Sequence, residues 1–180
     1  MEELVQLYDE NCNQIAGKSA TKKEALSKGL LHASSHVWIY RKVNHFLEFL
    51  IQRRASNKRT WPNMLDVSVA GHVEMGEAPE GAAVREAKEE IGLSISVDDL
   101  IATGTHRTRL VAKNGIIENE IQFLFVLELQ TGEDFELKRS EVSSIDWVPL
   151  NKFKASYNGD DYVPHGDDYY QKVINGILNQ

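Results

Sequence analysis

One segment constrains this chain more than any other, the run from Gly71 to Leu93, GHVEMGEAPEGAAVREAKEEIGL. Its second half predicts a helix from Pro79 to Ile91. The apolar residues Val84, Ala87 and Ile91 recur at i, i+3 and i+7 and form one apolar face along that helix. Three glutamates nevertheless crowd its end, where the macrodipole is negative and acidic side chains are unfavourable. This charge placement needs a physical reason.

The three glutamates can act together, because Glu86, Glu89 and Glu90 stand three and four residues apart on one helix. Like charges at this spacing repel by about a few tenths of a kcal/mol per exposed pair. A bound cation reverses that sign, and carboxylate oxygens are the ligands that Mg²⁺ and Mn²⁺ prefer. The alternative is a solvated acidic face, because the apolar face packs the helix down and leaves the glutamates facing outward. Gly92 is expected to end the helix.

The whole segment resembles the Nudix box, which reads glycine, five residues, glutamate, seven residues and then Arg-Glu-apolar-x-Glu-Glu-x-Gly-apolar. Every fixed position of that pattern is matched, by Gly71, Glu77, Arg85, Glu86, Ala87, Glu89, Glu90, Gly92 and Leu93. So many fixed residues in one span make the signal far more specific than a lone glycine motif. The resemblance implies a single Nudix domain over residues 1–180, with the box at 71–93 folded as a loop–helix–loop around Mg²⁺ or Mn²⁺.

The resemblance also implies roles for the residues of the box. The metal ligands it implies are Glu86, Glu89, Glu90 and the backbone carbonyl near Ala70 and Gly71. Catalytic roles fall to Glu89, Glu90 and Arg85, and Arg85 is expected to pair with Glu77 and hold the loop against the helix. The implied reaction is hydrolysis of a diphosphate joined to another group. A divalent metal neutralises phosphate charge and acidifies a bound water, for which a carboxylate can act as base.

A wider resemblance, over roughly residues 30–125, is to type I isopentenyl-diphosphate isomerase, a Nudix-fold enzyme that moves a double bond instead of hydrolysing its substrate. The segments that carry it are LLHASSHVWIY, RRASNKRTWPNMLDVSVAGHV and NGIIENEIQFLF. His32 and His72 match metal histidines of that enzyme, although each could also be an ordinary polar residue near a strand end. Glu118 and Glu120 match its paired acidic residues, and their i, i+2 spacing points both side chains to one face of a strand.

A basic stretch, QRRASNKRTW, stands out in an otherwise acidic chain. In it Arg54 and Lys58 fall where the isomerase binds diphosphate. Since Glu120 matches one of the paired acidic residues of the isomerase, the same resemblance implies that it is a further metal ligand. The substrate-binding residues that it implies are Arg54, Lys58, His72 and Glu118.

Departures from the isomerase favour a hydrolase. The isomerase has a catalytic cysteine just before the glycine that opens the box, where this chain has Ala70, and its tyrosine position is Thr108. Alanine has no thiol and cannot protonate a carbon. The box glutamates, which are degenerate in the isomerases, are complete here. We therefore predict a metal-dependent pyrophosphohydrolase that acts on a nucleoside diphosphate derivative or a related organic diphosphate. The alternatives are an isopentenyl-diphosphate isomerase and a non-catalytic module that binds a nucleotide.

The rest of the chain predicts a single α/β domain, an α/β/α sandwich around a mixed sheet. Strand patterns cover residues 2–10, 36–43, 46–54, 64–73, 99–111, 119–130 and 141–150, and helical patterns cover 150–156 and 167–180. Residues 11–18 are predicted as a turn and 21–31 as a weak helix or loop. The acidic, aromatic run YNGDDYVPHGDDYY is interpreted as a surface loop, with a lid over the substrate as the alternative.

Composition limits the function classes. The net charge of −7 argues against a nucleic-acid polymer as partner, while a small-molecule diphosphate can still bind through metal ions or a basic patch. No apolar run is long enough to cross a membrane. Cys12 is the only cysteine, and the acidic start lacks a signal-peptide pattern, so we expect a cytoplasmic protein. An exposed edge strand near the N-terminus is compatible with a homodimer.

Overall fold

A computed structural model describes residues 3–130 and 132–179, and Glu2 and Gln180, the outer ends of the first predicted strand and the last predicted helix, lie outside the described residues. The strands are β1 (Leu4–Tyr8), β2 (Gln14–Thr21), β3 (His32–Val43), β4 (Phe46–Arg54), β5 (Leu65–Asp66), β6 (Val69–His72), β7 (Ile101–Val111), β8 (Ile117–Glu128) and β9 (Val142–Pro149). The helices are α1 (Lys22–Lys28), α2 (Pro79–Ile91), α3 (Leu150–Ser156) and α4 (Asp167–Leu178), with a 3₁₀ turn at Val97–Asp99.

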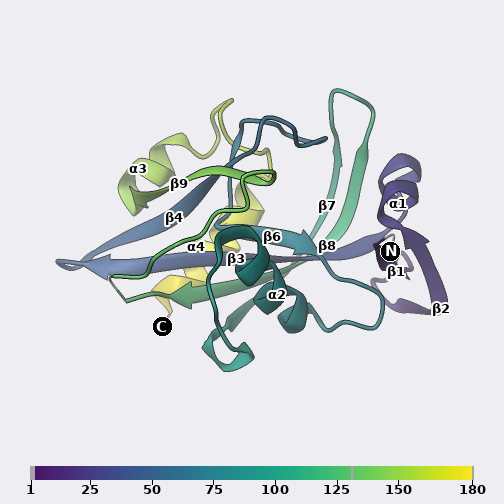
Figure 1. The fold of residues 1–180 in the computed structure, drawn as a ribbon, viewed down its shortest axis with the longest axis horizontal. Helices are drawn as coiled ribbons and strands as arrows, with labels where there is room; N and C mark the ends of the chain where they lie inside the picture. Colours follow the sequence, from purple (N-terminus) through teal and green to yellow (C-terminus); the bar gives the residue numbers. More distant parts are fainter. Residues whose placement is uncertain (1–2, 131, 180) are drawn as a thin grey trace.

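The larger sheet has the order β5-β4-β3-β8-β7, with β6 also paired to β3 and β9 also paired to β4. Strands β3 and β8 are parallel, from His32 beside Glu120 to Tyr40 beside Glu128. The other pairings among its named strands are antiparallel, so the sheet is mixed as predicted. Strands β1 and β2 form a separate hairpin beside α1 (Figure 1).

Helices cover both faces of this sheet, because its strands alternate apolar side chains between two cores. Val37 and Ile39 of β3 pack with Ala87 and Ile91 of α2, whereas Trp38 of β3 packs with the aromatic residues of α3 and α4. Figure 1 shows α2 on the near side of β3 and α4 behind it. The α/β/α sandwich is therefore confirmed.

The predicted strand over residues 64–73 is interrupted, and the interruption opens the sheet. Ser68 lies between β5 and β6, where it accepts the Ile39 N–H at 2.8 Å and donates to the Leu50 carbonyl at 2.5 Å. It thus bridges β3 and β4 at the point where they separate. Beyond Ser68, β6 takes the place of β4 beside β3, with Ala70 opposite His36. The resulting gap between β4 and β6 leaves room for a cavity.

Two predictions about irregular segments need correction. Residues 14–21 form strand β2 instead of continuing the predicted turn, because they pair with β1 from Tyr8 to Leu4. The run over residues 157–170 is not simply a surface loop. Tyr157, Tyr162, Val163 and His165 are all buried, and Tyr169 and Tyr170 of α4 fill the core. Among the described residues, no helix is both long and apolar enough to span a membrane.

Candidate active site

A cavity of about 630 Å³ lies where α1, α2, β6 and β8 approach the loop that follows β4. Every predicted site residue except Glu90 lines it, although these residues come from five different parts of the chain. Both acidic and basic side chains line it. The acidic ones include Glu86, Glu89, Glu118 and Glu120, and the basic ones include Lys22, Lys23, Arg54 and Lys58. A site with both charge types suits a metal–diphosphate ligand, which itself carries both.

Arg85 holds the loop before α2 against the helix, as predicted. Its Nε and Nη2 donate to the two Glu77 carboxylate oxygens at 3.0 and 2.9 Å, and Nη2 also donates to the His72 carbonyl at 3.0 Å. Its Nη1 donates to Glu86 at 2.7 Å. The hydrogen bond and charge of Arg85 outweigh burial and lower the pKa of Glu77. This two-point ion pair fixes both the loop and one predicted metal ligand.

The glutamates of α2 do not all face outward, which corrects one prediction. Glu86 and Glu90 are buried, with 9% and 3% of their surface exposed, while Glu89 is exposed. Val84 is only half-buried, because the small alanines at 82 and 83 turn the neighbouring face of α2 toward the sheet. Glu86 and Glu90 lie on that buried face and therefore point inward.

Close backbone packing accompanies the inward glutamates. The Glu90 carboxylate accepts the Ala70 N–H at 3.3 Å and the Gln52 side-chain amide at 3.4 Å. A side chain at Gly71 would overlap the Glu86 carboxyl group and displace it, so glycine allows this close approach. Burial, reinforced by the charge of Glu86, raises the pKa of Glu90 to about 8, and burial also raises the pKa of Glu86. Two carboxylates crowded in this way fit a divalent cation that would replace the proton.

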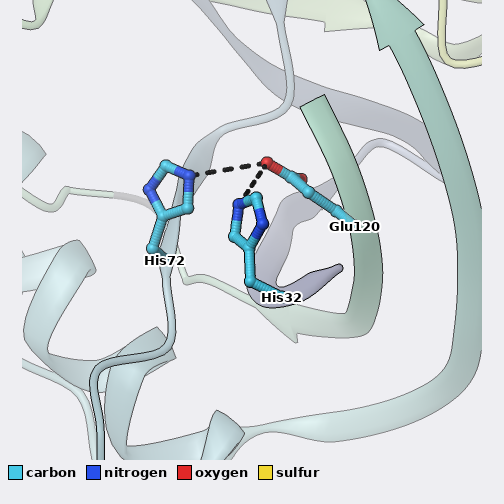
Figure 2. Close-up of side chains that lie close together, drawn as sticks. All are labelled: His32, His72 and Glu120. Atoms are coloured by element: carbon cyan, nitrogen blue, oxygen red, sulfur yellow. Dashed lines mark ion pairs between the residues drawn. The ribbon is translucent and has the colours of Figure 1, made fainter. Parts of the chain in front are cut away.

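A second cluster joins His32 of β3, His72 of β6 and Glu120 of β8, as Figure 2 shows. The Nε2 atoms of both histidines lie 3.5 Å from the same Glu120 oxygen, and the two rings stack with centroids 5.1 Å apart. One ligand atom from each residue falls within 4.8 Å of the others. Although burial opposes ionisation, the two histidines hold the pKa of Glu120 well below 4.5. Burial lowers the pKa of His72 to about 4.

The donor pattern of this cluster fits a metal ion. The Leu30 carbonyl, 2.8 Å from Nδ1 of His32, can only accept, so Nδ1 carries a proton and Nε2 is the nitrogen that a metal could take when the ring is neutral. Although burial opposes protonation, the neighbouring Glu120 raises the pKa of His32, so a cation would compete with a proton for Nε2. That Nε2 and both ring nitrogens of His72 are buried without a hydrogen-bond partner among the described residues. Two imidazole nitrogens and a carboxylate are a ligand set for Mn²⁺ or Zn²⁺.

A directed chain of hydrogen bonds supports Glu120 from behind. The Ser34 hydroxyl donates to Glu120 at 2.8 Å, so it accepts from Nε2–H of His36 at 3.2 Å. Nδ1 of that neutral ring accepts from the Tyr169 hydroxyl at 2.7 Å, while Trp38 Nε1 donates to Tyr169 at 3.0 Å. Burial lowers the pKa of His36 to about 3, which keeps this ring neutral.

The predicted diphosphate residues lie at the cavity but are already engaged. Arg54 donates to the Thr60 carbonyl at 3.1 Å and pairs with Asp66 at 3.0 Å, so it also holds the loop after β4. Lys58 pairs with Glu141 at 3.0 Å. Lys22, Lys23 and Lys138 line the same cavity and were not predicted, because isolated lysines in weak helices and loops carry no sequence signal.

Glu118 and Trp61 form another unpredicted contact at the cavity. Trp61 Nε1 donates to Glu118 at 2.6 Å, and the indole packs on Leu26, Ala112 and Ile116. Trp61 has a φ of 51°, a conformation that costs energy for a bulky residue and that its contacts must maintain. Burial raises the pKa of Glu118.

Comparison with known proteins agrees with this geometry. A family model described as NUDIX domain matches residues 30–166. An uncharacterized Nudix hydrolase of Clostridium acetobutylicum is 30% identical over 99% of this chain and 98% of its own. Isopentenyl-diphosphate Delta-isomerase 2 of Photorhabdus laumondii is also 30% identical, over 100% of this chain and 95% of its own. The crystal structure of DR0079 from Deinococcus radiodurans, 18% identical, has a TM-score of 0.69 over 96% of this chain and 98% of that one.

Proposed function

The chain belongs to the Nudix hydrolase family, and we propose that it is a metal-dependent pyrophosphohydrolase of a nucleoside diphosphate derivative or a related organic diphosphate. The observation that supports this proposal most strongly is that Glu86 of the complete box lines the same cavity as His72 and Glu120. Box and histidine cluster thus border one space large enough for a small molecule. Proteins of this family generally cleave pyrophosphate bonds.

We assign the metal ligands to two groups. Glu86, Glu89, Glu90 and the backbone at Gly71 would hold Mg²⁺ or Mn²⁺ on the α2 side, while His32, His72 and Glu120 would hold a further ion. A bound divalent ion neutralises phosphate charge and supplies an activated water.

The chain's own residues bind, orient and move protons. Arg85 fixes Glu86 and the loop through four hydrogen bonds. Ala70 N–H and Gln52 orient Glu90. Glu89, which is exposed, lines the cavity and lies 3.8 Å from Lys138, would accept a proton from the attacking water. The lysines of α1 and Lys58 add positive charge where a diphosphate would lie.

Isomerisation of isopentenyl diphosphate is a second candidate, which the histidine cluster and the similarity to an isomerase favour. Ala70 opposes it, because this residue lines the cavity and supplies no acid or base there. Incubation with isopentenyl diphosphate and detection of the dimethylallyl isomer would establish that activity. We expect no isomer to form.

The test of the proposal is phosphate release across a panel of nucleotides, nucleotide sugars, dinucleoside polyphosphates and prenyl diphosphates, with Mg²⁺ or Mn²⁺. Turnover of at least one diphosphate, lost on chelation, is the expected result. Absence of turnover throughout the panel, together with tight nucleotide binding by calorimetry, would instead identify a non-catalytic binding module.

We also propose a cytoplasmic location and leave the homodimer as a prediction. The exposed free thiol of Cys12 suits a reducing compartment. The outer edge of the β1–β2 hairpin offers a strand edge for a second copy. Sedimentation analysis of the purified chain tests the dimer.

A further inference from the structure

The inner wall of the cavity contains buried polar atoms that no other described residue contacts with a hydrogen bond. Gln122 of β8 is 2% exposed, and its Oε1 has no hydrogen-bond partner among the described residues. His165, which precedes α4, is 7% exposed, and its Nδ1 is likewise unpartnered there. Both residues line the cavity. An unpartnered buried polar atom is costly, so each such atom indicates a partner that arrives from outside.

Side-chain and strand contacts join these two residues into one surface, which we call the polar wall and define as Ser34, His36, Asp66, Gln122 and His165. Gln122 lies beside Ser34 in the parallel register of β3 and β8, and Ser34 is bonded to His36 at 3.2 Å. The His36 and His165 rings lie 5.5 Å apart, and His165 is bonded to Asp66 at 2.8 Å. All five residues line the cavity.

The polar wall is rigidly built. His165 stacks on Tyr169 with ring centroids 4.3 Å apart, and Asp66 is held by Arg54 at 3.0 Å. Although burial opposes ionisation, the hydrogen bond from His165 and the charge of Arg54 keep the pKa of Asp66 well below 3.8. The His165 ring is therefore fixed in orientation. Its Nε2 is hydrogen-bonded to Asp66, and its Nδ1 has no hydrogen-bond partner among the described residues.

The chemistry of the two unpartnered atoms selects the ligand group. With Nε2–H donated to Asp66, Nδ1 of a neutral His165 accepts a hydrogen bond, whereas a charged ring would donate one. The Gln122 amide accepts through oxygen and would donate if its two ends were exchanged. A hydroxyl both donates and accepts, so it satisfies either atom in either state. A hydrocarbon group satisfies neither.

Resting on the proposed function, we propose that the polar wall binds the organic half of the substrate and selects a hydroxyl-bearing group, such as the ribose or hexose of a nucleoside diphosphate derivative, over an apolar prenyl group. The side chains that line the cavity are polar or charged, apart from Leu26, Trp61, Ala70 and Val163. A prenyl group at the polar wall would cover Gln122 and His165 without offering a hydrogen bond to either residue. Sites that bond a substrate hydroxyl reject analogues that lack it strongly.

The test uses two methylene bisphosphonates whose organic groups have the same number of carbons and whose P–C–P linkage cannot be hydrolysed. One carries ribose through its 5-carbon and the other carries an isopentyl group. Calorimetry with Mg²⁺ measures both dissociation constants for the full chain. We expect the ribosyl compound to bind about 100-fold more tightly. Equal or tighter binding of the isopentyl compound would overturn the inference.

Two substitutions in the polar wall test whether this surface is the source of the preference for the ribosyl compound. Gln122→Met and His165→Phe, which lie on different elements, should each weaken the ribosyl compound about tenfold or more and leave the isopentyl compound unchanged or tighter. The control Gln171→Met replaces an exposed glutamine of α4 and should leave the ratio of the two constants within about twofold. Thermal unfolding identifies any variant that does not fold. An unchanged ratio in a folded Gln122 or His165 variant would also overturn the inference.

Turnover on the substrate panel distinguishes this inference from the proposed function. A ribosyl preference without hydrolysis of any diphosphate would overturn the proposed function and support the polar wall. Hydrolysis combined with a preference for the isopentyl compound would support the proposed function and overturn the polar wall.

Discussion

Two carboxylate clusters lie at the cavity, one on α2 and one on the sheet, and their carboxyl groups are stabilised in different ways. On α2, the carboxylates of Glu86 and Glu90 are crowded together, and burial keeps a proton on Glu90. On the sheet, Glu120 stands between two imidazoles that keep it ionised. The first cluster holds a proton that a cation can replace, whereas the second offers a cation an ionised carboxylate and two imidazole nitrogens.

Because of this difference, we expect the two clusters to prefer different metal ions. Carboxylate oxygens suit Mg²⁺ and Mn²⁺, while imidazole nitrogens suit Zn²⁺ better. Their supports differ as well. Arg85 fixes the helix cluster through an ion pair, but a hydrogen-bond chain from Tyr169 through His36 and Ser34 fixes Glu120. The four experiments that follow can break or sharpen this contrast.

The largest expected effect comes from Glu90→Gln. Loss of a metal ligand forfeits several kcal/mol of transition-state stabilisation, so kcat should fall by about 10³-fold or more. Steady-state phosphate release measures it, with the exposed Glu133→Gln as matched control. Full activity of Glu90→Gln would show that the helix cluster is not the catalytic one.

A smaller effect, about 10²-fold in kcat, is expected for Gly71→Ala. The added methyl group would overlap the Glu86 carboxyl and displace it from the position that Arg85 fixes. Gly81→Ala is the control, because a methyl group there meets Glu77 at an ordinary 3.5 Å and should stabilise α2 slightly. If both alanine variants behave alike, the close approach of Gly71 to Glu86 has no functional role.

His32→Asn separates the two clusters by metal binding. It removes one nitrogen ligand and should weaken Mn²⁺ binding at the histidine cluster by about tenfold or more, without changing binding at the helix cluster. Electron paramagnetic resonance titration measures Mn²⁺ in this variant and in Glu90→Gln, and the exposed His45→Asn serves as control. One class of site lost in both variants would mean that the clusters bind a single shared ion.

The smallest effects are opposite pH dependences of the metal-free protein. Glu90 has a folded-state pKa of about 8, above 4.5, so its contribution is fully present below about pH 4.5 and is lost as the pH rises toward 8. Glu120 has a folded-state pKa below 4.5, so its contribution is present above that value and is lost as the pH falls. Each slope is at most about 1.4 kcal/mol per pH unit.

Urea unfolding from about pH 2 to about pH 9 with a chelator present measures both slopes, because the Glu120 contribution is lost below pH 4.5 and the Glu90 contribution between pH 4.5 and 8. Glu90→Gln should flatten the alkaline side and Glu120→Gln the acid side. A variant that flattens the opposite side would contradict the protonation states assigned to the two clusters.

Much of the fold could be predicted from the sequence because periodic signals are local. The bounds of α2 and α3 were predicted to the residue, and Gly92 ends α2 with a φ of 73°. The direction of Glu86 and Glu90 was not, since the alanines of α2 give too little contrast in hydrophobicity to orient it. Strand β2 was missed because its polar, mostly exposed residues carry no alternation.

The candidate site was predictable only where a resemblance supplied it. The pairing of Arg85 with Glu77 is confirmed by the structure. The site roles assigned to the box glutamates, Arg54 and Lys58 stay predictions. The polar wall could not be predicted at all, because Asp66 and His165 are 99 residues apart and neither stands in a motif.

The position of Trp61 gives the protein an optical reporter. Trp38 is buried in the core and Trp147 lies beneath Arg41, 4.2 Å from the guanidinium, so neither touches the cavity. Trp61 alone among the tryptophans lines it, with its indole N–H bonded to a carboxylate. A ligand that binds the Glu118 carboxylate or covers the Trp61 ring should change the fluorescence emission of Trp61. Unlabelled protein can therefore be titrated in a fluorimeter, and Trp61→Phe would identify the source of the signal.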